Sequence, residues 1–423
     1  MAEGNPSEQR LLSKGSIWQV RPLRRFMIGH LASSLGSRMA YAAVLWHVYE
    51  LTASPILLGS VGLTQLLPVL VVGPLGGILA DRFDRRTLLL WTQLVQAVPT
   101  ALLGVLTLSE ALAAWHLFAL VLCVSFAESI DTAARKALIP SITPTEHLGG
   151  AMALADMVKN GAKLAGPALM GFLAAAASIG MVYLLNAVSF LLMAGMLATL
   201  RRSPRPEHPA ESGGFSLVRD LREAGRFIRH TPMVWGLLVL DFVATLFASA
   251  VDLLPMYATE VLQLDVGQYG LLASGVAVGA LTASMVMVRL PIPRIPGRVC
   301  VVAGLLFGLG ATALGLVDQF WPAFACLALL GAADTVGTVV RNTVRELITP
   351  DALRGRVGAL ASLVTKSGPR VGEWEAGFVA SIWGVQASIL TGGVLCIVGV
   401  AALGLGLPVL RRPVHLEEAG GAP

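Results

Sequence analysis

The sequence predicts an all-α membrane protein in which twelve transmembrane helices form two pseudo-symmetric six-helix bundles. The first supporting observation is composition: hydrophobic residues make up 55% of the 423 residues and charged residues 13%, about half the charged share of soluble domains. The second is a series of twelve apolar runs, each long enough to cross a bilayer. The third is an internal repeat, which divides these runs into two sets of six.

The expected spans follow one another with mostly short polar connections. Their approximate bounds are 24–49, 55–80, 87–109, 114–139, 148–175, 179–200, 232–258, 267–289, 298–317, 321–344, 357–382 and 386–410. An even number of spans places both termini on one side of the membrane.

The charges of the connections alternate between the two faces of the membrane. Arginines gather on one face, for example Arg85, Arg202 and Arg298. The short turns of the other face carry Glu110 and Asp318 and no lysine or arginine. The positive-inside rule therefore places both termini in the cytoplasm, and we expect a multi-pass protein of the cytoplasmic membrane.

The longest polar interruption, 201–231, separates the two sets of spans. Its prolines and Gly213-Gly214 predict a flexible linker. Apolar and basic residues then occupy opposite helix faces over 217–228, which predicts an amphipathic helix on the cytoplasmic surface, with a solvated linker helix as the alternative. The expected segments are a cytoplasmic N-terminal segment 1–23, a bundle 24–200, the linker 201–231, a bundle 232–410 and a cytoplasmic tail 411–423.

The two halves match one another at an offset of 206 residues. Arg135 matches Arg341, and Ile142-Thr143-Pro144 matches Ile348-Thr349-Pro350. Glycines match as well, since Gly171 corresponds to Gly377. The repeat predicts two bundles related by an axis along the membrane normal, with a site between them at mid-depth.

A short connection, 77–88, joins the second and third spans. It reads Gly-Ile-Leu-Ala-Asp-Arg-Phe-Asp-Arg-Arg-Thr-Leu and resembles the Gly-x-Leu-Ala-Asp-Arg-x-Gly-Arg-Arg signature of major facilitator superfamily transporters, except at Asp84, where the signature has glycine. The resemblance implies transport by alternating access, with an ion pair between Asp81 and Arg135 closing the inner gate. The expected gating residues are Gly77, Asp81, Arg82, Arg85, Arg86 and Arg135.

Charged residues inside the spans are the next candidates, because each is costly in hydrocarbon unless it is paired or faces water. Lys163 and Arg370 lie about fifteen residues into their spans, near the bilayer centre, and are the first choices for holding an anionic group. Asp156 could instead be a simple intrahelical partner of Lys159. The substrate-binding candidates are Arg38, Lys163, Arg370, Lys366, Glu373 and Asp156.

Energy coupling is expected to use an ion gradient, since the sequence has no GxxxxGK[ST] nucleotide-binding run. A carboxylate in a buried site favours its protonated form and can carry a proton between the two sides. Asp241 has no opposite charge in its own span; a neighbouring helix or Arg38 could partner it. The proton-coupling candidates are Asp241, Glu128, Asp334 and Asp131.

Three further stretches, 219–228, 253–257 and 349–357, resemble the superfamily branch that contains the enterobactin exporter and macrolide efflux proteins. That resemblance implies export of a small amphipathic molecule in exchange for protons. The basic residues at mid-depth favour an anionic, siderophore-like metabolite over a cationic drug.

Other functions share part of this pattern. An uptake symporter would have every feature described so far, whereas an intramembrane hydrolase lacks an HExxH or GxSxG motif, and a sensor would usually add a soluble domain. Because the four cysteines lie in apolar runs without a CxxC pair, no metal site is indicated. We expect no enzymatic activity, no cofactor, no nucleic-acid binding and a monomer whose partners are a small-molecule substrate, protons and the lipid bilayer.

Overall fold

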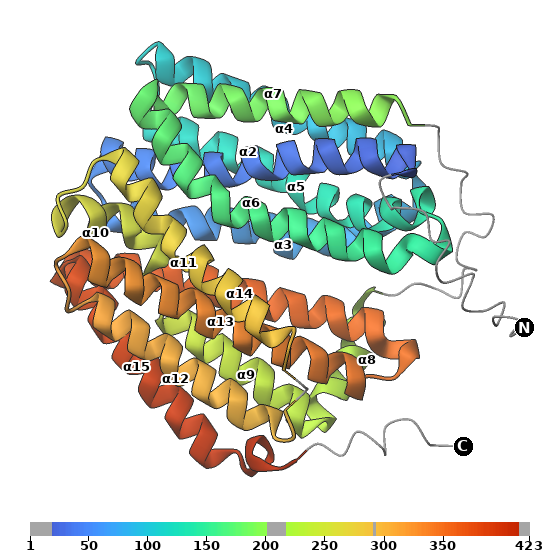
Figure 1. Ribbon diagram of the computed structural model, residues 1–423, viewed down its shortest axis with the longest axis vertical. Helices are drawn as coiled ribbons and strands as arrows, with labels where there is room; N and C mark the ends of the chain where they lie inside the picture. The colour runs from blue at the N-terminus through green and yellow to red at the C-terminus, as the bar shows by residue number, and fades with distance from the viewer. Residues whose placement is uncertain (1–18, 201–216, 291–292, 414–423) are drawn as a thin grey trace, which may run out of the picture.

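The computed structural model describes residues 19–200, 217–290 and 293–413, and within these ranges the chain contains helices and no strand. The long helices run roughly side by side in two layers (Figure 1). The expectation of an all-α fold is confirmed.

Six long helices form the first half. They are α2 (Arg21–Thr52), α3 (Pro55–Arg82), α4 (Arg85–Leu108), α5 (Ala114–Ile142), α6 (Leu148–Ala176) and α7 (Ile179–Ala198). Their starts follow capping chemistry: the Ser54 hydroxyl accepts a hydrogen bond from the Leu57 N–H at the start of α3, and Ser178 does the same for Met181 at the start of α7.

The second half begins with the amphipathic helix α8 (Leu217–His230), which ends in the basic pair Arg229 and His230. The helices that follow are α9 (Pro232–Phe247), α10 (Leu254–Glu260), α11 (Val266–Met287), α12 (Pro296–Leu314), α13 (Phe320–Ile348), α14 (Asp351–Trp383) and α15 (Val385–Gly406). The linker 201–216 lies outside the described residues.

The expected continuous span 232–258 was wrong in one respect. The chain breaks after α9, makes a short 3₁₀ turn (η3, Ala250–Leu253) and resumes as α10. Pro255 lies at the first turn of α10, where its missing N–H costs nothing, whereas inside one long helix it would remove a hydrogen bond.

Eight helices of the described chain are long and apolar enough to cross a membrane by length and composition alone, or nine if the bent pair 222–230 and 232–247 is one span. Helices α2, α6 and α14 fall outside this set because they carry polar and charged residues along their length, and α9 is only 16 residues long. Helices α2, α6 and α14 hold several of the basic residues considered below, among them Arg38, Lys163 and Arg370.

The repeat seen in the sequence recurs in the helix bounds. Adding 206 to the bounds of α5 gives 320–348, which are the bounds of α13, and adding 206 to the first residue of α7 gives 385, the first residue of α15. Two six-helix bundles with equivalent elements result. The first contains α2 to α7, and the second contains α9 to α15 when α9 and α10 are counted as one broken helix.

The bundles meet along two helix pairs, α3 with α14 and α6 with α11. In Figure 1 the first bundle lies above the second; the two converge beside α10 and the start of α11, and diverge toward α8. Glycines make the close contact. A Cβ at Gly171 of α6 would lie 2.8 Å from the Gly267 carbonyl oxygen of α11, and one at Gly377 of α14 would lie 2.4 Å from the Pro55 carbonyl oxygen of α3.

We call this contact, between 55–62 and 370–377 on one side and 167–171 and 267–270 on the other, the closed seam. Gly171 and Gly377 are equivalent in the repeat, so the same small residue serves both halves of the seam. At the opposite ends of the same helices, a Cβ added at Gly149 or at Gly355 would have no neighbouring atom within 4 Å. The bundles therefore pack closely at the seam end and diverge toward the other end (Figure 1).

The outer helix faces carry large exposed apolar side chains. Trp91, Val98, Phe172 and Trp321 are each more than 60% exposed. Fully buried aromatic residues, Tyr183 and Phe190 of the first bundle and Tyr257 and Tyr269 of the second, fill the interior. This arrangement, apolar both inside and outside, is that of a protein whose surrounding solvent is lipid.

Candidate functional site

The hinge between α3 and α4 is short because the end of α3 is followed almost at once by the residue that caps α4. Helix α3 ends at Arg82, and Asp84 caps α4 by accepting hydrogen bonds from the backbone N–H (3.1 Å) and the hydroxyl (2.6 Å) of Thr87. Asp84 therefore has a role of its own at the position where the superfamily signature has glycine. The Asp-x-x-Thr spacing is the sequence signal for this cap.

Two arginines of the hinge tie the start of α4 to its own bundle. Arg85 donates to the Ala137 carbonyl of α5 (3.1 Å), and Arg86 donates to the carbonyls of Leu197 (2.8 Å) and Ala198 (2.7 Å) at the end of α7. The Arg86 acceptors are carbonyls at the C-terminus of α7, which have no partner within the helix. The side chains of Gly77, Asp81 and Arg82 lie outside the described residues.

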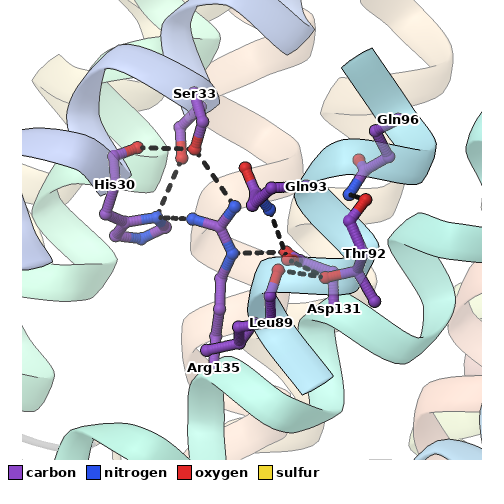
Figure 2. A network of polar contacts seen from close by, with 9 residues as sticks. His30, Ser33, Leu89, Thr92, Gln93, Gln96, Asp131 and Arg135 are labelled. Atoms are coloured by element: carbon purple, nitrogen blue, oxygen red, sulfur yellow. Dashed lines mark hydrogen bonds and ion pairs between the residues drawn. The ribbon is translucent and has the colours of Figure 1, made fainter. Parts of the chain in front are cut away.

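Arg135 of α5 is the centre of a buried polar network in the first bundle, shown in Figure 2. It forms an ion pair with Asp131 one turn earlier, contacts the His30 ring of α2 and donates to the Ser33 hydroxyl (3.1 Å). Asp131 in turn accepts hydrogen bonds from Gln93 (2.6 Å) and Thr92 (3.0 Å) of α4. The network joins three helices, which is how a buried charge pair is made tolerable in a low-dielectric interior.

The structure therefore places Asp131 in an ion pair rather than as a free acid, and the Arg135 guanidinium is already engaged within its own bundle. An ion pair between Arg135 and Asp81 remains a proposal for another conformational state. His30 was not identified from the sequence, although a histidine within an apolar run was the available signal.

A second buried ion pair lies in the other bundle. Asp241 of α9 pairs with Arg341 of α13, and Arg341 also donates to the Thr338 hydroxyl (3.1 Å). Arg341, and not Arg38, is therefore the partner of Asp241, because α9 and α13 are neighbours within one bundle. The pair lines a narrow cavity together with Asp334 and Cys300.

Five basic side chains on four helices of both bundles lie within electrostatic range of Lys159 or are Lys159 itself. We call them the basic cluster: Arg38 of α2, Lys136 of α5, Lys159 and Lys163 of α6, and Lys366 of α14. Lys159 is repelled by the charge of each of the other four, so the cluster crosses from the first bundle to the second. Lys159, Lys163 and Lys366 are exposed although they lie in the middle of long helices, and Lys136, near the end of α5, is exposed as well.

Two acids at equivalent positions of the repeat lie near lysines of the basic cluster. Glu128 of the first bundle attracts Lys366 of the second, and Asp334 of the second bundle attracts Lys163 of the first. Glu128 and Asp334 are equivalent in the repeat and both are exposed. Asp156 lies one turn before Lys159, and the described residues include no ion pair between them. Counting all three acids, five cations face three carboxylates and the region keeps excess positive charge.

Arg370 and Glu373 occupy a different place from the one expected. Arg370 does not face an open site; it forms an ion pair with Glu373 of its own helix (2.9 Å), lies 3.5 Å from Asp252 of η3, and donates to the Tyr41 hydroxyl of α2 (2.8 Å). These contacts lie at the closed seam. Asp252 and Tyr41 were not identified from the sequence, although Asp252, an acid inside the expected span 232–258, carried the same signal as Asp241.

Metal binding finds no support in the part of the chain that the structure describes, where no group of three or more His, Cys, Asp or Glu side chains is arranged to hold an ion. The chemistry available between the bundles is electrostatic: lysines that can bind an anionic group and acids that can exchange protons.

Comparison with known families places the chain among transporters. Residues 19–413 match the family described as transmembrane secretion effector. The enterobactin exporter EntS of Salmonella choleraesuis (strain SC-B67) is 26% identical over 338 residues, which are 80% of each chain. The MFS-type transporter YfiS of Bacillus subtilis (strain 168) is 30% identical over 216 residues, half of each chain.

A solved structure shares the fold. The inward-facing, occupied form of a bacterial homologue of the human lysosomal transporter Spinster superposes with a TM-score of 0.74 at 14% sequence identity, over 97% of this chain and 100% of the other. At this identity the likeness concerns the fold, which in the described ranges is twelve long helical segments in two bundles, counting α9 with η3 and α10 as one.

Proposed function

The chain belongs to the transmembrane secretion effector family of the major facilitator superfamily, and we propose that it exports a small anionic or amphipathic molecule in exchange for protons. It is a multi-pass membrane protein and a secondary transporter, not an enzyme. Direction, coupling ion and substrate class are the proposed part.

The basic cluster is the observation that carries the proposal. Its lysines come from both bundles, so a substrate held there would touch the two parts that must move relative to one another during alternating access. Lysine ammonium groups form charge-assisted hydrogen bonds with carboxylate or catecholate oxygens, and these bonds are roughly twice as strong as neutral ones. The named export activity of the relative EntS, which acts on enterobactin, supports the outward direction and a siderophore-like substrate.

The orientation follows from the charge of the connections. With both termini in the cytoplasm, the end at which the bundles diverge faces the cytoplasm and the closed seam faces outward. The structure then represents an inward-facing state that is ready to receive an internal substrate. We expect the gating residues of the hinge to act in the opposite state, when this inner end closes.

The direct test uses the purified protein in proteoliposomes with an imposed proton gradient and an internal pH dye. Catecholate and carboxylate siderophores, a macrolide, a cationic dye and a sugar are added separately. Proton movement opposite to that of an anionic compound supports the proposal. Protons moving together with the substrate would identify an uptake symporter, and coupled transport of the cationic dye alone would remove the anionic substrate class.

Substitution of Lys163 provides the corresponding prediction. Lys163→Ala removes one charge-assisted hydrogen bond, worth about 1.5–3 kcal/mol, so the KM for an anionic substrate should rise by about tenfold or more while a neutral compound is unaffected. Lys163→Arg keeps the charge and is the matched control. Equal losses for anionic and neutral compounds would assign Lys163 to packing instead.

A further inference from the structure

Four side chains form a polar network across the closed seam. Tyr41 of α2 donates to the Asp252 carboxylate of η3 and accepts a hydrogen bond from Arg370 of α14 (2.8 Å). Arg370 also pairs with Glu373 (2.9 Å) and lies 3.5 Å from Asp252. Tyr41 belongs to the first bundle and the other three to the second, so the network links the two moving parts. We call it the seam network.

The seam network contains one more acid than base. Asp252 and Glu373 share a single guanidinium, and Glu373 is only 5% exposed. Both carboxyl groups lie within 3.5 Å of the same Arg370 nitrogen, so two acids crowd one cation, and such a pair of neighbouring carboxyl groups favours holding one proton between them. One bound proton brings the two acids and Arg370 to a net charge of zero.

Among the described residues, the groups of α3 and α11 that face the two acids carry no positive charge that could replace this proton. Helix α3 faces Glu373 with Gly59 and Gly62, which carry no charge, and a Cβ at Gly62 would lie 1.8 Å from a Glu373 carboxylate oxygen. Tyr269 of α11 is buried and neutral, and it lies within electrostatic range of Asp252. Lys163 of α6 and Lys366 of α14, two members of the basic cluster, both lie within electrostatic range of Arg370.

We propose that Asp252 and Glu373 share one proton while the seam is closed, and that release of this proton opens the seam. The proposal deepens the function proposed above and rests on its proton coupling. With the proton gone, two carboxylates compete for Arg370 beside the uncharged glycine backbone of α3. Two like charges in a low-dielectric site repel, and separation of α3 from α14 admits water to the extra charge.

This arrangement couples proton uptake and release to closing and opening of the seam, which is what antiport requires. A proton taken up from outside neutralises the network and allows the seam to close, which returns the transporter to the inward-facing state. Loss of that proton toward the cytoplasm frees the seam to open with substrate bound. Asp241, Glu128 and Asp334 are then left to other roles, Asp241 in its ion pair with Arg341 and the two exposed acids beside the lysines of the basic cluster.

The test measures the seam itself. Leu51→Cys at the end of α2 and Trp383→Cys at the end of α14, both exposed positions at the seam end, carry spin labels in a background whose four native cysteines are alanine. Label-to-label distances are recorded by double electron–electron resonance in proteoliposomes at mildly acidic and mildly alkaline pH, without substrate. We expect a short distance in acid and a growing population of longer distances in alkali.

Two variants and one control make the result specific. Glu373→Gln and Asp252→Asn each imitate the protonated network, so each should keep the short distance at every pH. Glu375→Gln lies two residues away on α14, outside the network, and should keep the full pH response. Using two variants retains the test if one of them does not fold, as judged by size-exclusion chromatography.

The outcomes separate this proposal from the one on which it rests. A distance that does not change with pH in the native network, or a response that persists in both Glu373→Gln and Asp252→Asn, overturns the shared proton. If proton-driven transport is observed in proteoliposomes together with either of these results, the exporter stands and its proton site lies elsewhere. A pH-driven seam with no transport of anionic compounds supports the shared proton and removes only the substrate class.

Discussion

Replacing Arg341 with alanine is expected to lower the free energy of unfolding by about 3–5 kcal/mol, because it leaves the buried Asp241 carboxylate without its partner. Asp241 is 7% exposed and lies in the interior of a six-helix bundle, where an unpaired charge is poorly hydrated. The measurement is thermal unfolding in detergent micelles, followed by the loss of a monodisperse peak on size-exclusion chromatography.

The matched control removes both charges together. An Asp241→Leu and Arg341→Met double variant replaces the ion pair with apolar side chains of similar size, a change that is often neutral for stability. It should recover most of what Arg341→Ala loses. If the double variant is as unstable as the single one, packing around Arg341, rather than the stranded charge, is the source of the loss.

Replacing Gly331 with leucine is the second change with a large expected effect. Gly331 of α13 and Gly279 of α11 form a reciprocal contact: a Cβ at Gly331 would lie 1.7 Å from the Val276 carbonyl oxygen, and one at Gly279 would lie 1.7 Å from that of Ala328. The obstacle is backbone on both sides, so the helices must move apart. We expect destabilisation at or above the roughly 1–3 kcal/mol typical of overpacked cores.

Gly355→Ala is the control for this prediction. Gly355 lies on α14 with no atom within 4 Å of its Cβ position, so alanine there should be neutral or stabilising by up to about 1 kcal/mol through helix propensity. The same thermal unfolding assay compares the two variants. Similar unfolding temperatures for Gly331→Leu and the unaltered protein would contradict the close approach of α11 and α13.

Much of the architecture was predictable from the sequence because it depends on periodic and local properties. Apolar runs of bilayer length identify membrane helices whatever their neighbours are, and the 206-residue offset predicts equivalent bundles because homologous stretches fold alike. The offset even identified Gly171 and Gly377, the glycines of the closed seam, although their contact could not be inferred from it.

The candidate site was predicted less completely. The sequence showed which spans carry charges, and the basic cluster contains three of the residues selected on that ground, Arg38, Lys163 and Lys366. The sequence could not show which of these charges form ion pairs with one another. Asp241 looked isolated because its partner Arg341 is 100 residues away, and Arg370 looked free because Asp252 and Tyr41 reach it from other helices.

By itself, then, the sequence determined the class of protein, the helices, the repeat and the set of charged residues inside the membrane. Only the tertiary structure decided which of these charges are neutralised by partners and which face the other bundle. The physical reason is range: hydropathy, capping and periodicity act within about twenty residues, the length of one span, whereas an ion pair requires side-chain atoms within a few ångströms, and helix packing alone sets that distance. In this chain that difference separates the paired Asp131 and Asp241 from the exposed lysines on which transport is proposed to depend.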